Sequence, residues 1–476
     1  MNRRALLKTT GRLAAAAAVG PCLSRIAGAG EPPQKPNVVF VFADQWRAQA
    51  AGYAGDTNVR TPAIDRLAAQ AVRFTTAVST CPVCSPYRAS LLTGRYPLTH
   101  GVFLNDVCLS NEAVSMAQAF KQGGYRTAYI GKWHLDGHGR SSFIPPERRQ
   151  GFEFWRTLEC THDYNNSCYY ADENVKLKWD GYDAIAQTRE AQGYIRSQAG
   201  KGPFLLVLSW GPPHNPYQTA PAQYAQKYKP DALVLRPNVP AAAAAAARKD
   251  LAGYYAHCEA LDDCLGALCS TLRECGIEDD TILVFTSDHG DMLGSHGEAR
   301  KQRPYDESIR VPLLVRWPRL GKDRSIAAPI GTPDLMPTLL GLCGLEVPKT
   351  VEGADFSGHI RGGPAPGDAA AIIACYAPFG EWTRARGGRE YRGIRTARHT
   401  CVRSLSGPWL LFDNEADPYQ QKNLCGEPQH AALQKEMEEL LQKKLRETRD
   451  EFQPADYYIA KWKHMTDKSG TAPYAP

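Results

Sequence analysis

Three short runs of apolar residues constrain the fold of this chain more than any other feature. Residues 38–42, 204–208 and 281–285 consist almost entirely of Val, Leu, Ile and Phe. Runs of this length and composition are typical of strands buried on both faces of a parallel sheet. Because helices cover both faces of such sheets, we predict a large α/β fold.

Polar side chains follow each of these runs. Asp44 comes after the first run, His214 after the second, and Asp288 with His289 after the third. Ligands of open α/β sheets bind beyond the carboxyl ends of the strands. We therefore expect these four side chains to meet at one edge of the sheet.

Helix-start signals alternate with the predicted strands. A Thr or Ser stands before a Pro at positions 61–62, 85–86 and 332–333. This order is typical of a capping residue followed by the first helical residue. A Gly- and Pro-rich segment then marks a change of composition near residue 365. We expect a large α/β domain over residues 31–365 and a smaller α+β subdomain over residues 366–476.

The first 30 residues have the composition of an export signal. Arg3 and Arg4 precede an apolar stretch, residues 13–19, which leads to small residues at positions 27–29. The adjacent arginines favour twin-arginine export, with an ordinary secretory signal as the alternative. The apolar stretch is well short of the about 18 residues that a membrane-spanning helix needs. We expect a periplasmic or secreted bacterial protein with no membrane span.

The charge of the chain argues against nucleic acid as a partner. The formal net charge is +6, and the predicted leader contributes five basic residues and no acidic one. The rest of the chain is therefore close to neutral. It has no run of Lys and Arg that would neutralise a phosphate backbone.

The cysteines are too few for a disulfide scaffold, at fourteen in 476 residues. Cys160 and Cys168 flank a loop and could pair outside the cytoplasm. Cys81 and Cys84 form a C-x-x-C pair, which by itself fits a redox motif, half of a zinc site or an incidental spacing. The zinc alternative lacks a well-spaced second pair, and the redox alternative leaves the polar strand ends unexplained.

Cys84 also lies at the predicted start of a helix. Free backbone N–H groups and the helix dipole stabilise an anion at such a position. Arg88, one turn further along the helix, adds a fixed positive charge. A cysteine in this setting is primed for reaction, and the same position suits a tetrahedral oxyanion such as sulfate or phosphate.

Residues 84–95, CSPYRASLLTGR, resemble the signature of the formylglycine-dependent type I sulfatases of the alkaline phosphatase superfamily. In that family a formylglycine-generating enzyme oxidises the signature cysteine to an aldehyde, 3-oxoalanine or formylglycine, and its hydrate is the nucleophile. Cys84 is the matching position. The resemblance implies an alkaline-phosphatase-like core with a large, mostly parallel sheet flanked by helices, and a C-terminal α+β subdomain with an antiparallel sheet.

The resemblance extends over most of the chain, including the first strand at residues 36–45 and the segment GKWHL at residues 131–135. It implies metal ligands and catalytic residues at matching positions. The implied metal ligands are Asp44, Gln45, Asp288, His289 and the aldehyde made from Cys84. The implied catalytic residues are Cys84, Arg88, Lys132, His134, His214 and Lys301.

The resemblance also implies a role for each catalytic side chain. Arg88 would hold the hydrated aldehyde, and Lys132 and Lys301 would balance charge on the sulfuryl oxygens. His214 would protonate the leaving alcohol. His134 would take a proton from the second hydroxyl of the hydrate.

Two positions depart from the pattern of many sulfatases. Gln45 stands where they have a second aspartate, and His289 stands where they have an asparagine. Oxygen ligands suit Ca²⁺, our first expectation, while the imidazole widens the tolerance towards Mn²⁺ or Zn²⁺. The phosphonate monoester and phosphodiester hydrolases of the same superfamily resemble this chain at both positions. A hydrolase of that type is the alternative function.

We expect the substrate to be a sulfated carbohydrate or an aryl sulfate. Segment 160–170 is rich in aromatic and hydrogen-bonding side chains, which suit recognition of a sugar or, equally, a packed surface loop. The candidate substrate contacts are His162, Tyr164, Trp46 and Arg47. A non-catalytic sulfoglycan-binding protein is an alternative of another class, but it predicts eroded site positions, and the matched positions are intact.

Overall fold

A computed structural model describes residues 35–473, so the predicted export signal at residues 1–30 lies outside the described residues. Within the described part of the chain, no helix is long and apolar enough to cross a membrane. The domain boundary predicted near residue 366 falls in the loop between α10 (Ser357–Ile360) and β13 (Ala370–Cys375). That boundary stays a proposal.

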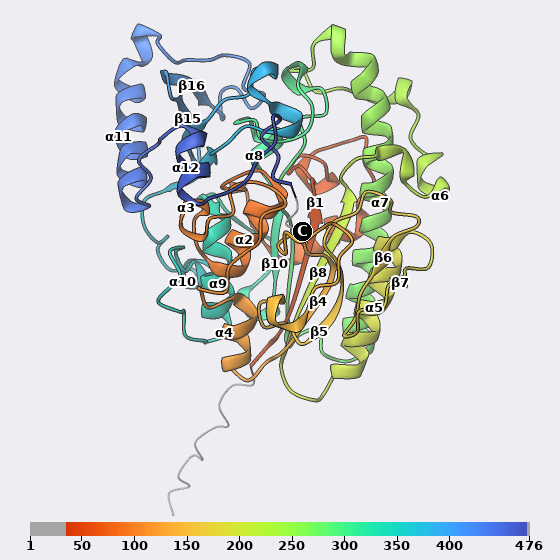
Figure 1. Ribbon diagram of the computed structural model, residues 1–476. Coiled ribbons are helices and arrows are strands. Elements are labelled where there is room, and N and C mark those ends of the chain that lie inside the picture. The colour runs from red at the N-terminus through yellow and green to blue at the C-terminus, as the bar shows by residue number, and fades with distance from the viewer. Residues whose placement is uncertain (1–34, 474–476) are drawn as a thin grey trace, which may run out of the picture. The chain divides into compact units, whose positions relative to one another are not determined.

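The three predicted strands form the middle of an eight-stranded sheet (Figure 1). β1 (Asn37–Asp44) pairs in parallel with both β8 (Phe204–Pro213) and β9 (Thr281–Ser287). The outer strands are β4 (Arg126–Lys132) and β5 (Phe154–Leu158) beyond β8, and β10 (Leu313–Arg316), β2 (Val72–Phe74) and β11 (Arg324–Ile326) beyond β9. β10 runs antiparallel to both of its neighbours, so the sheet is mostly parallel, as predicted.

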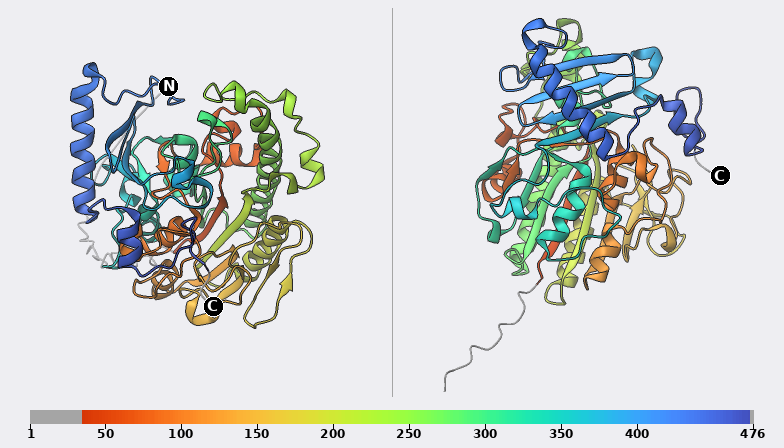
Figure 2. Two further views of the ribbon diagram at one scale, coloured as in Figure 1. Left: turned by 45° about the horizontal axis from the view of Figure 1, so that its top comes forward. Right: turned by 90° about the vertical axis from the view of Figure 1, so that its left-hand side faces the viewer.

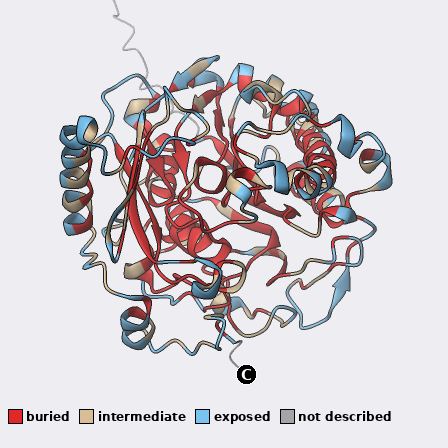
Figure 3. Cartoon of the chain, turned by 90° about the horizontal axis from the view of Figure 1, so that it is seen from above, coloured by how far each residue is buried: buried red, intermediate tan, exposed pale blue. Residues whose placement is uncertain are grey.

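β1 packs on both faces, which explains its uninterrupted apolar sequence. Val38, Phe40 and Phe42 belong to the core on one face, and Val39 and Val41 to the core on the other. All five side chains are fully buried, and Figure 3 shows the central strands in the buried colour. A polar side chain at any of these positions would be buried at a cost in free energy unless it found a hydrogen-bond partner.

Helices cover both faces of the sheet (Figure 1). The helices that pack on the face of Phe40 are α2 (Cys84–Thr93), α4 (Met116–Gln122) and α9 (Leu335–Leu342). Those on the face of Val39 are α1 (Pro62–Gln70), α5 (Asp183–Gln198) and α7 (Ala244–Glu274). The shorter elements are α3 (Pro97–His100), α6 (Ala222–Ala225), α8 (Asp306–Ile309), α12 (Ala455–Lys461), and the paired two-residue strands β3 (Ala77–Val78) with β12 (Ile330–Gly331) and β6 (Cys168–Tyr169) with β7 (Leu177–Lys178).

One predicted helix start is shifted in a way that matters for the site. α2 begins at Cys84 itself and its preceding residue is Val83, so Ser85 lies inside the first turn and is not the capping residue. The hydroxyl of Ser85 instead donates to the backbone carbonyl of His134 at 2.7 Å. Cys84 is thus the first residue of α2, where the helix dipole is most positive.

The C-terminal part forms the predicted antiparallel sheet. Its strands lie in the order β13, β14 (Tyr391–Thr396), β15 (His399–Ser404) and β16 (Gly407–Asp413). α11 (Ala431–Glu447) lies across one face of this sheet, as Figure 2 shows, and buries Leu441 there. The opposite face packs on Val78 and Ile309, which belong to the part of the chain that carries the large sheet.

A buried ion pair connects β14 with α8. Nε and Nη2 of Arg395 each donate to one carboxylate oxygen of Asp306, both at 3.1 Å. Nη1 of Arg310 donates to the same carboxylate at 3.0 Å. Burial opposes ionisation of this carboxyl, but the two arginines outweigh it and lower the pKa of Asp306 to about 2. Removal of the carboxylate would leave a buried guanidinium without its partner.

Asp306→Ala is therefore expected to lower the free energy of unfolding by about 3–5 kcal/mol at pH 7, measured by urea denaturation. Asp180→Ala, which removes a solvent-exposed partner of Arg189, should cost less than about 1 kcal/mol. Because the folded pKa of Asp306 lies below its ordinary value of about 3.9, its contribution is present above pH 4 and is lost as the pH falls towards 2. Equal stability of Asp306→Ala and the parent at pH 7 would contradict this account.

Candidate active site

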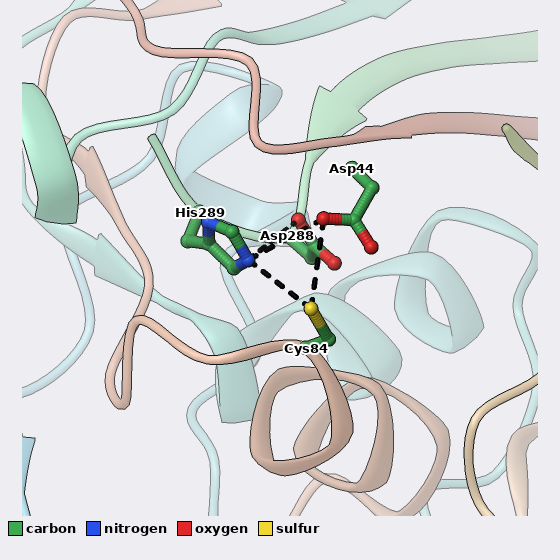
Figure 4. Close-up of side chains that lie close together, drawn as sticks. All are labelled: Asp44, Cys84, Asp288 and His289. Atoms are coloured by element: carbon green, nitrogen blue, oxygen red, sulfur yellow. Dashed lines mark hydrogen bonds and ion pairs between the residues drawn. The ribbon is translucent and has the colours of Figure 1, made fainter. Parts of the chain in front are cut away.

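Four buried side chains converge where β1, β9 and α2 meet (Figure 4). Asp44 is the last residue of β1, Asp288 and His289 follow β9 directly, and Cys84 opens α2. One side-chain atom from each residue lies within 4.8 Å of the others. Because β1 and β9 are adjacent and parallel, their carboxyl ends meet, as the sequence predicts.

The ring of His289 is oriented towards this cluster. Its Nε2 lies 3.3 Å from Cys84 Sγ and 3.5 Å from a carboxylate oxygen of both Asp44 and Asp288. Its Nδ1 lies 2.9 Å from the backbone carbonyl of Gly290. A proton on Nδ1 satisfies that carbonyl and leaves the lone pair of Nε2 for the cluster, which is the usual arrangement of a metal-binding histidine.

Gln45 adjoins this cluster through Asp288. Its backbone has a φ of 73°, and its N–H donates to Asp288 Oδ1 at 2.9 Å. Its side-chain Nε2 donates to Asp291 Oδ2 at 2.6 Å, while its Oε1 is buried with no hydrogen-bond partner among the described residues. A buried carbonyl oxygen without a partner is costly, and a bound cation would satisfy it. The donor set of carboxylates, amide oxygen and imidazole therefore fits a divalent cation.

Two buried cations face the carboxylates. Arg88 Nη2 lies 3.1 Å from Oδ2 of both Asp44 and Asp288, and Lys132 Nζ lies 2.6 Å from Asp44 Oδ2. Burial raises the pKa of Asp44, but Lys132 and the neighbouring basic groups outweigh burial and hold it well below its usual range. Burial and the adjacent Asp44 raise the pKa of Asp288 to about 6. A divalent cation would relieve this repulsion between the two carboxylates.

Cys84 differs sharply from its partner in the C-x-x-C pair. Burial and Asp44 oppose its ionisation, but Lys132, Lys301 and His289 together lower the pKa of Cys84 well below its usual range. Lys301 Nζ lies 3.2 Å from its sulfur. Burial alone raises the pKa of Cys81 to about 12. Cys84 is therefore the reactive thiol of the pair, because the thiolate is the nucleophilic form.

A cavity of about 160 Å³ adjoins Cys84. Besides Cys84, four of the predicted catalytic residues line it: Lys132, His134, His214 and Lys301. Lys301 Nζ also lies 3.0 Å from His214 Nε2, and burial together with Lys301 holds the pKa of His214 well below its usual range. A small cavity with two ammonium groups and a neutral imidazole suits a tetrahedral anion.

The structure separates the four candidate substrate contacts. His162 lines the cavity and stacks on His214, with 4.6 Å between the ring centroids. Trp46, Arg47 and Tyr164 are buried and are not among the described residues that line this cavity. Tyr164 donates to the backbone carbonyl of His214 at 2.9 Å and so supports that loop. A role of these three residues in substrate binding stays a prediction.

Sequence reasoning missed Asp106 and Arg140, which line the same cavity. Asp106 accepts a hydrogen bond from His134 Nε2 at 2.8 Å. Both missed residues lie in irregular segments outside the matched motifs, so no sequence signal marks them. Cys160 also lines the cavity, and both it and Cys168 are free thiols.

The arrangement agrees with comparisons to known proteins. A family model described as Sulfatase matches residues 36–345, which is more than half of the chain. This chain belongs to the sulfatase family. A second model, described as N-sulphoglucosamine sulphohydrolase, C-terminal, matches residues 294–448 of the sulfatase.

Individual relatives support the same assignment. The sulfatase is 47% identical to the ulvan-active sulfatase of Formosa agariphila, over 93% of this chain and 88% of the relative. It is 29% identical to the endo-4-O-sulfatase of Bacteroides thetaiotaomicron, over 83% of this chain and 89% of the relative. A Bacteroides fragilis structure assigned as the sulfatase YidJ superposes with a TM-score of 0.79 at 32% identity, over 91% of this sulfatase and 99% of that chain.

The fold itself is shared more widely. The phosphonate monoester hydrolase of Agrobacterium radiobacter superposes with a TM-score of 0.69 at 23% identity, over 93% of this sulfatase and all of that chain. At this identity the likeness shows the fold alone. The predicted alkaline-phosphatase-like core and the predicted sulfatase activity are confirmed.

Proposed function

We propose that this sulfatase removes sulfate from a sulfated carbohydrate, using an aldehyde made from Cys84 beside a divalent cation. The observation that carries the proposal is the position of Cys84, which opens α2 with its sulfur 3.5 Å from Asp44, 3.3 Å from His289 and 3.2 Å from Lys301. The 47% identity to an ulvan-active sulfatase makes ulvan the first sulfated polysaccharide to test.

Conversion of Cys84 requires a formylglycine-generating enzyme as a partner during maturation. If the leader directs twin-arginine export, conversion precedes transport of the folded protein to the periplasm or the exterior. Asp44, Gln45, Asp288, His289 and the converted Cys84 would hold the cation, with Ca²⁺ as first choice and Mn²⁺ or Zn²⁺ as alternatives. The hydrated aldehyde would supply the attacking oxygen, and the cation would lower the pKa of that oxygen.

The basic side chains around the cavity would bind and orient the substrate. Lys132 and Lys301 would bind the sulfuryl oxygens, because both ammonium groups line the cavity beside Cys84. Arg88 lies one turn after Cys84 in α2, and its Nη1 donates to Lys132 O and to Ser209 Oγ, each at 2.7 Å. This fixed guanidinium would hold the group at position 84 in one orientation.

Two histidines would move the protons. Lys301 Nζ would supply the proton: His214 Nε2 would accept it from the ammonium group and pass it to the leaving oxygen of the ester. His134 would accept a proton at Nδ1, which is buried without a hydrogen-bond partner among the described residues. Burial lowers the pKa of His134, but the Cys160 thiolate and Asp106 outweigh burial and raise it, so they stabilise the imidazolium that forms when the ring accepts this proton.

A phosphonate monoester or phosphodiester hydrolase is the second candidate. Gln45 and His289 favour it, because they stand where many sulfatases have Asp and Asn; His289 belongs to the cluster, and the N–H of Gln45 donates to Asp288. Parallel measurements of kcat/KM on sulfated polysaccharide, aryl sulfate and phosphonate monoester separate the two candidates. We expect a sulfate ester to be the best substrate. A higher kcat/KM on the phosphonate than on every sulfate ester would overturn the first choice.

Asp291→Asn tests whether Gln45 contributes to metal binding. Asp291 accepts from Gln45 Nε2, so it fixes which end of the amide is free to ligate. Loss of such an outer hydrogen bond is expected to weaken Ca²⁺ binding by about 10–100-fold, measured by calorimetry on the metal-stripped protein. Asp263→Asn, which alters a carboxylate bonded to Tyr224, should bind Ca²⁺ like the parent. Equal Ca²⁺ affinity of Asp291→Asn and the parent would contradict the role given to Gln45.

A further inference from the structure

His134 is held by a buried carboxylate that is outside every sequence motif of the site. Asp106 Oδ1 lies 2.8 Å from His134 Nε2, and the two side chains are 1% and 2% exposed. Arg140 contacts the same carboxylate, with Nη2 3.0 Å from Oδ2 and Nε 3.5 Å from Oδ1. Because a carboxylate only accepts hydrogen bonds, Nε2 of His134 must carry a proton.

The ring of His134 is also fixed through its backbone. Its φ is 60°, and its carbonyl accepts from the hydroxyl of Ser85, which is the neighbour of Cys84 in α2. The second ring nitrogen, Nδ1, is buried with no hydrogen-bond partner among residues 35–473. His134 and Cys84 line the same cavity. The free nitrogen is thus left for a group that enters the cavity or is made at position 84.

We propose that Asp106 is a positioning residue for the sulfatase reaction: it fixes the proton of His134 on Nε2, so that Nδ1 accepts the proton of a hydroxyl at position 84. In that step the O–H bond breaks, its electron pair stays on oxygen, and the new N–H bond forms at Nδ1. Asp106 then stabilises the positive charge on the imidazolium. This inference rests on the proposed function of Cys84.

Arg140 determines how the side-chain amide of an asparagine at position 106 would be oriented. Its guanidinium has only donors, so it attracts the amide oxygen of an asparagine and turns the amide nitrogen towards His134. That nitrogen is a donor and needs a lone pair on Nε2. The ring proton would move to Nδ1, and His134 could no longer accept a proton there.

Asp106→Asn is therefore expected to lower kcat by about 10²–10⁴-fold with a much smaller change in KM, on whichever sulfate ester the parent enzyme hydrolyses. A double-mutant cycle tests whether the effect passes through His134. Asp106→Asn should cause no further loss in a protein that already carries His134→Ala. Additive losses would overturn the inference, because they would mean that Asp106 acts independently of His134.

Asp136→Asn is the matched control. Asp136 is an equally buried carboxylate that bridges an arginine, Arg148, and a histidine, His138, but it is not among the described residues that line the cavity. The control should retain kcat within a few-fold of the parent. If Asp136→Asn lost as much kcat as Asp106→Asn, the loss would follow from removing any buried carboxylate in this region and not from the contact with His134. That result would overturn the inference.

A second readout needs neither conversion of Cys84 nor turnover. Nitrogen-15 NMR of the unconverted protein should show a hydrogen-bonded proton on Nε2 of His134, and this signal should be lost in Asp106→Asn. The same signal in both proteins would overturn the inference. A parent enzyme that contains the aldehyde but hydrolyses no sulfate ester would overturn the proposed function instead, while the NMR comparison would still decide whether Asp106 sets the tautomer.

Discussion

Cys84→Ala is expected to reduce kcat on sulfate esters by about 10⁵-fold or more while leaving the fold intact. The loss is large because the substitution removes the precursor of the nucleophile, and removal of a nucleophile from a hydrolase has effects of this order. The fold should tolerate the change because alanine is a good helix former and Cys84 is the first residue of α2. The measurement is kcat with a sulfated substrate, together with a circular dichroism melt.

Cys81→Ala is the matched control for this prediction. Cys81 is also buried, and it belongs to the apolar core around α2 and not to the cluster of Asp44, Cys84, Asp288 and His289. The Cys81→Ala variant should keep the kcat of the parent. Substantial turnover by Cys84→Ala, or an equal loss in Cys81→Ala, would contradict the assignment of the nucleophile.

Asp44→Asn is expected to have the second largest effect. Asp44 contacts Cys84, His289, Arg88 and Lys132, so it is the carboxylate on which the cluster and its balancing cations converge. A bound cation stabilises transition-state charge by several kcal/mol, and each 1.36 kcal/mol corresponds to a factor of ten in rate. We therefore expect kcat to fall by about 10³-fold or more, with a parallel loss of bound metal measured by inductively coupled plasma mass spectrometry.

A buried aspartate elsewhere in the fold controls for the loss of a carboxylate. Asp262 accepts from the backbone N–H groups of Ala63 and Ile64 at 2.9 and 2.7 Å, and it is not one of the four clustered residues. Asp262→Asn should retain the metal and the kcat of the parent. Full metal content and full kcat in Asp44→Asn would contradict the proposed ligand set.

Much of the fold was predictable because its physical causes are local in the sequence. The apolar side chains of residues 38–42 point to both faces of the strand, so both faces must be covered. The helical layers on the two sides of the parallel sheet cover them. The polar residues that end β1 and β9 meet because these strands are neighbours and parallel. The cluster of Asp44, Cys84, Asp288 and His289 could therefore be predicted from strand ends and motifs together.

Other features depend on contacts between distant segments and left no local signal. Asp106 meets His134 only because two irregular loops fold together, and an isolated aspartate in a loop has many ordinary explanations. Trp46 and Arg47 come just after Gln45 at the end of β1, yet their side chains are buried and do not line the cavity beside Cys84. The direction of a side chain after a strand end depends on the backbone turn, which the sequence pattern does not specify.

The central claim is that the active enzyme carries an aldehyde at position 84. Trypsin should release residues 74–88 as one peptide that contains both Cys81 and Cys84. In active enzyme treated with a thiol-alkylating reagent and a hydrazide, the mass of this peptide should show one alkylated thiol, at Cys81, and one hydrazone, at position 84. The hydrazone fraction should rise in proportion to kcat across preparations. Two alkylated thiols in a preparation that hydrolyses sulfate esters at full rate would contradict the account.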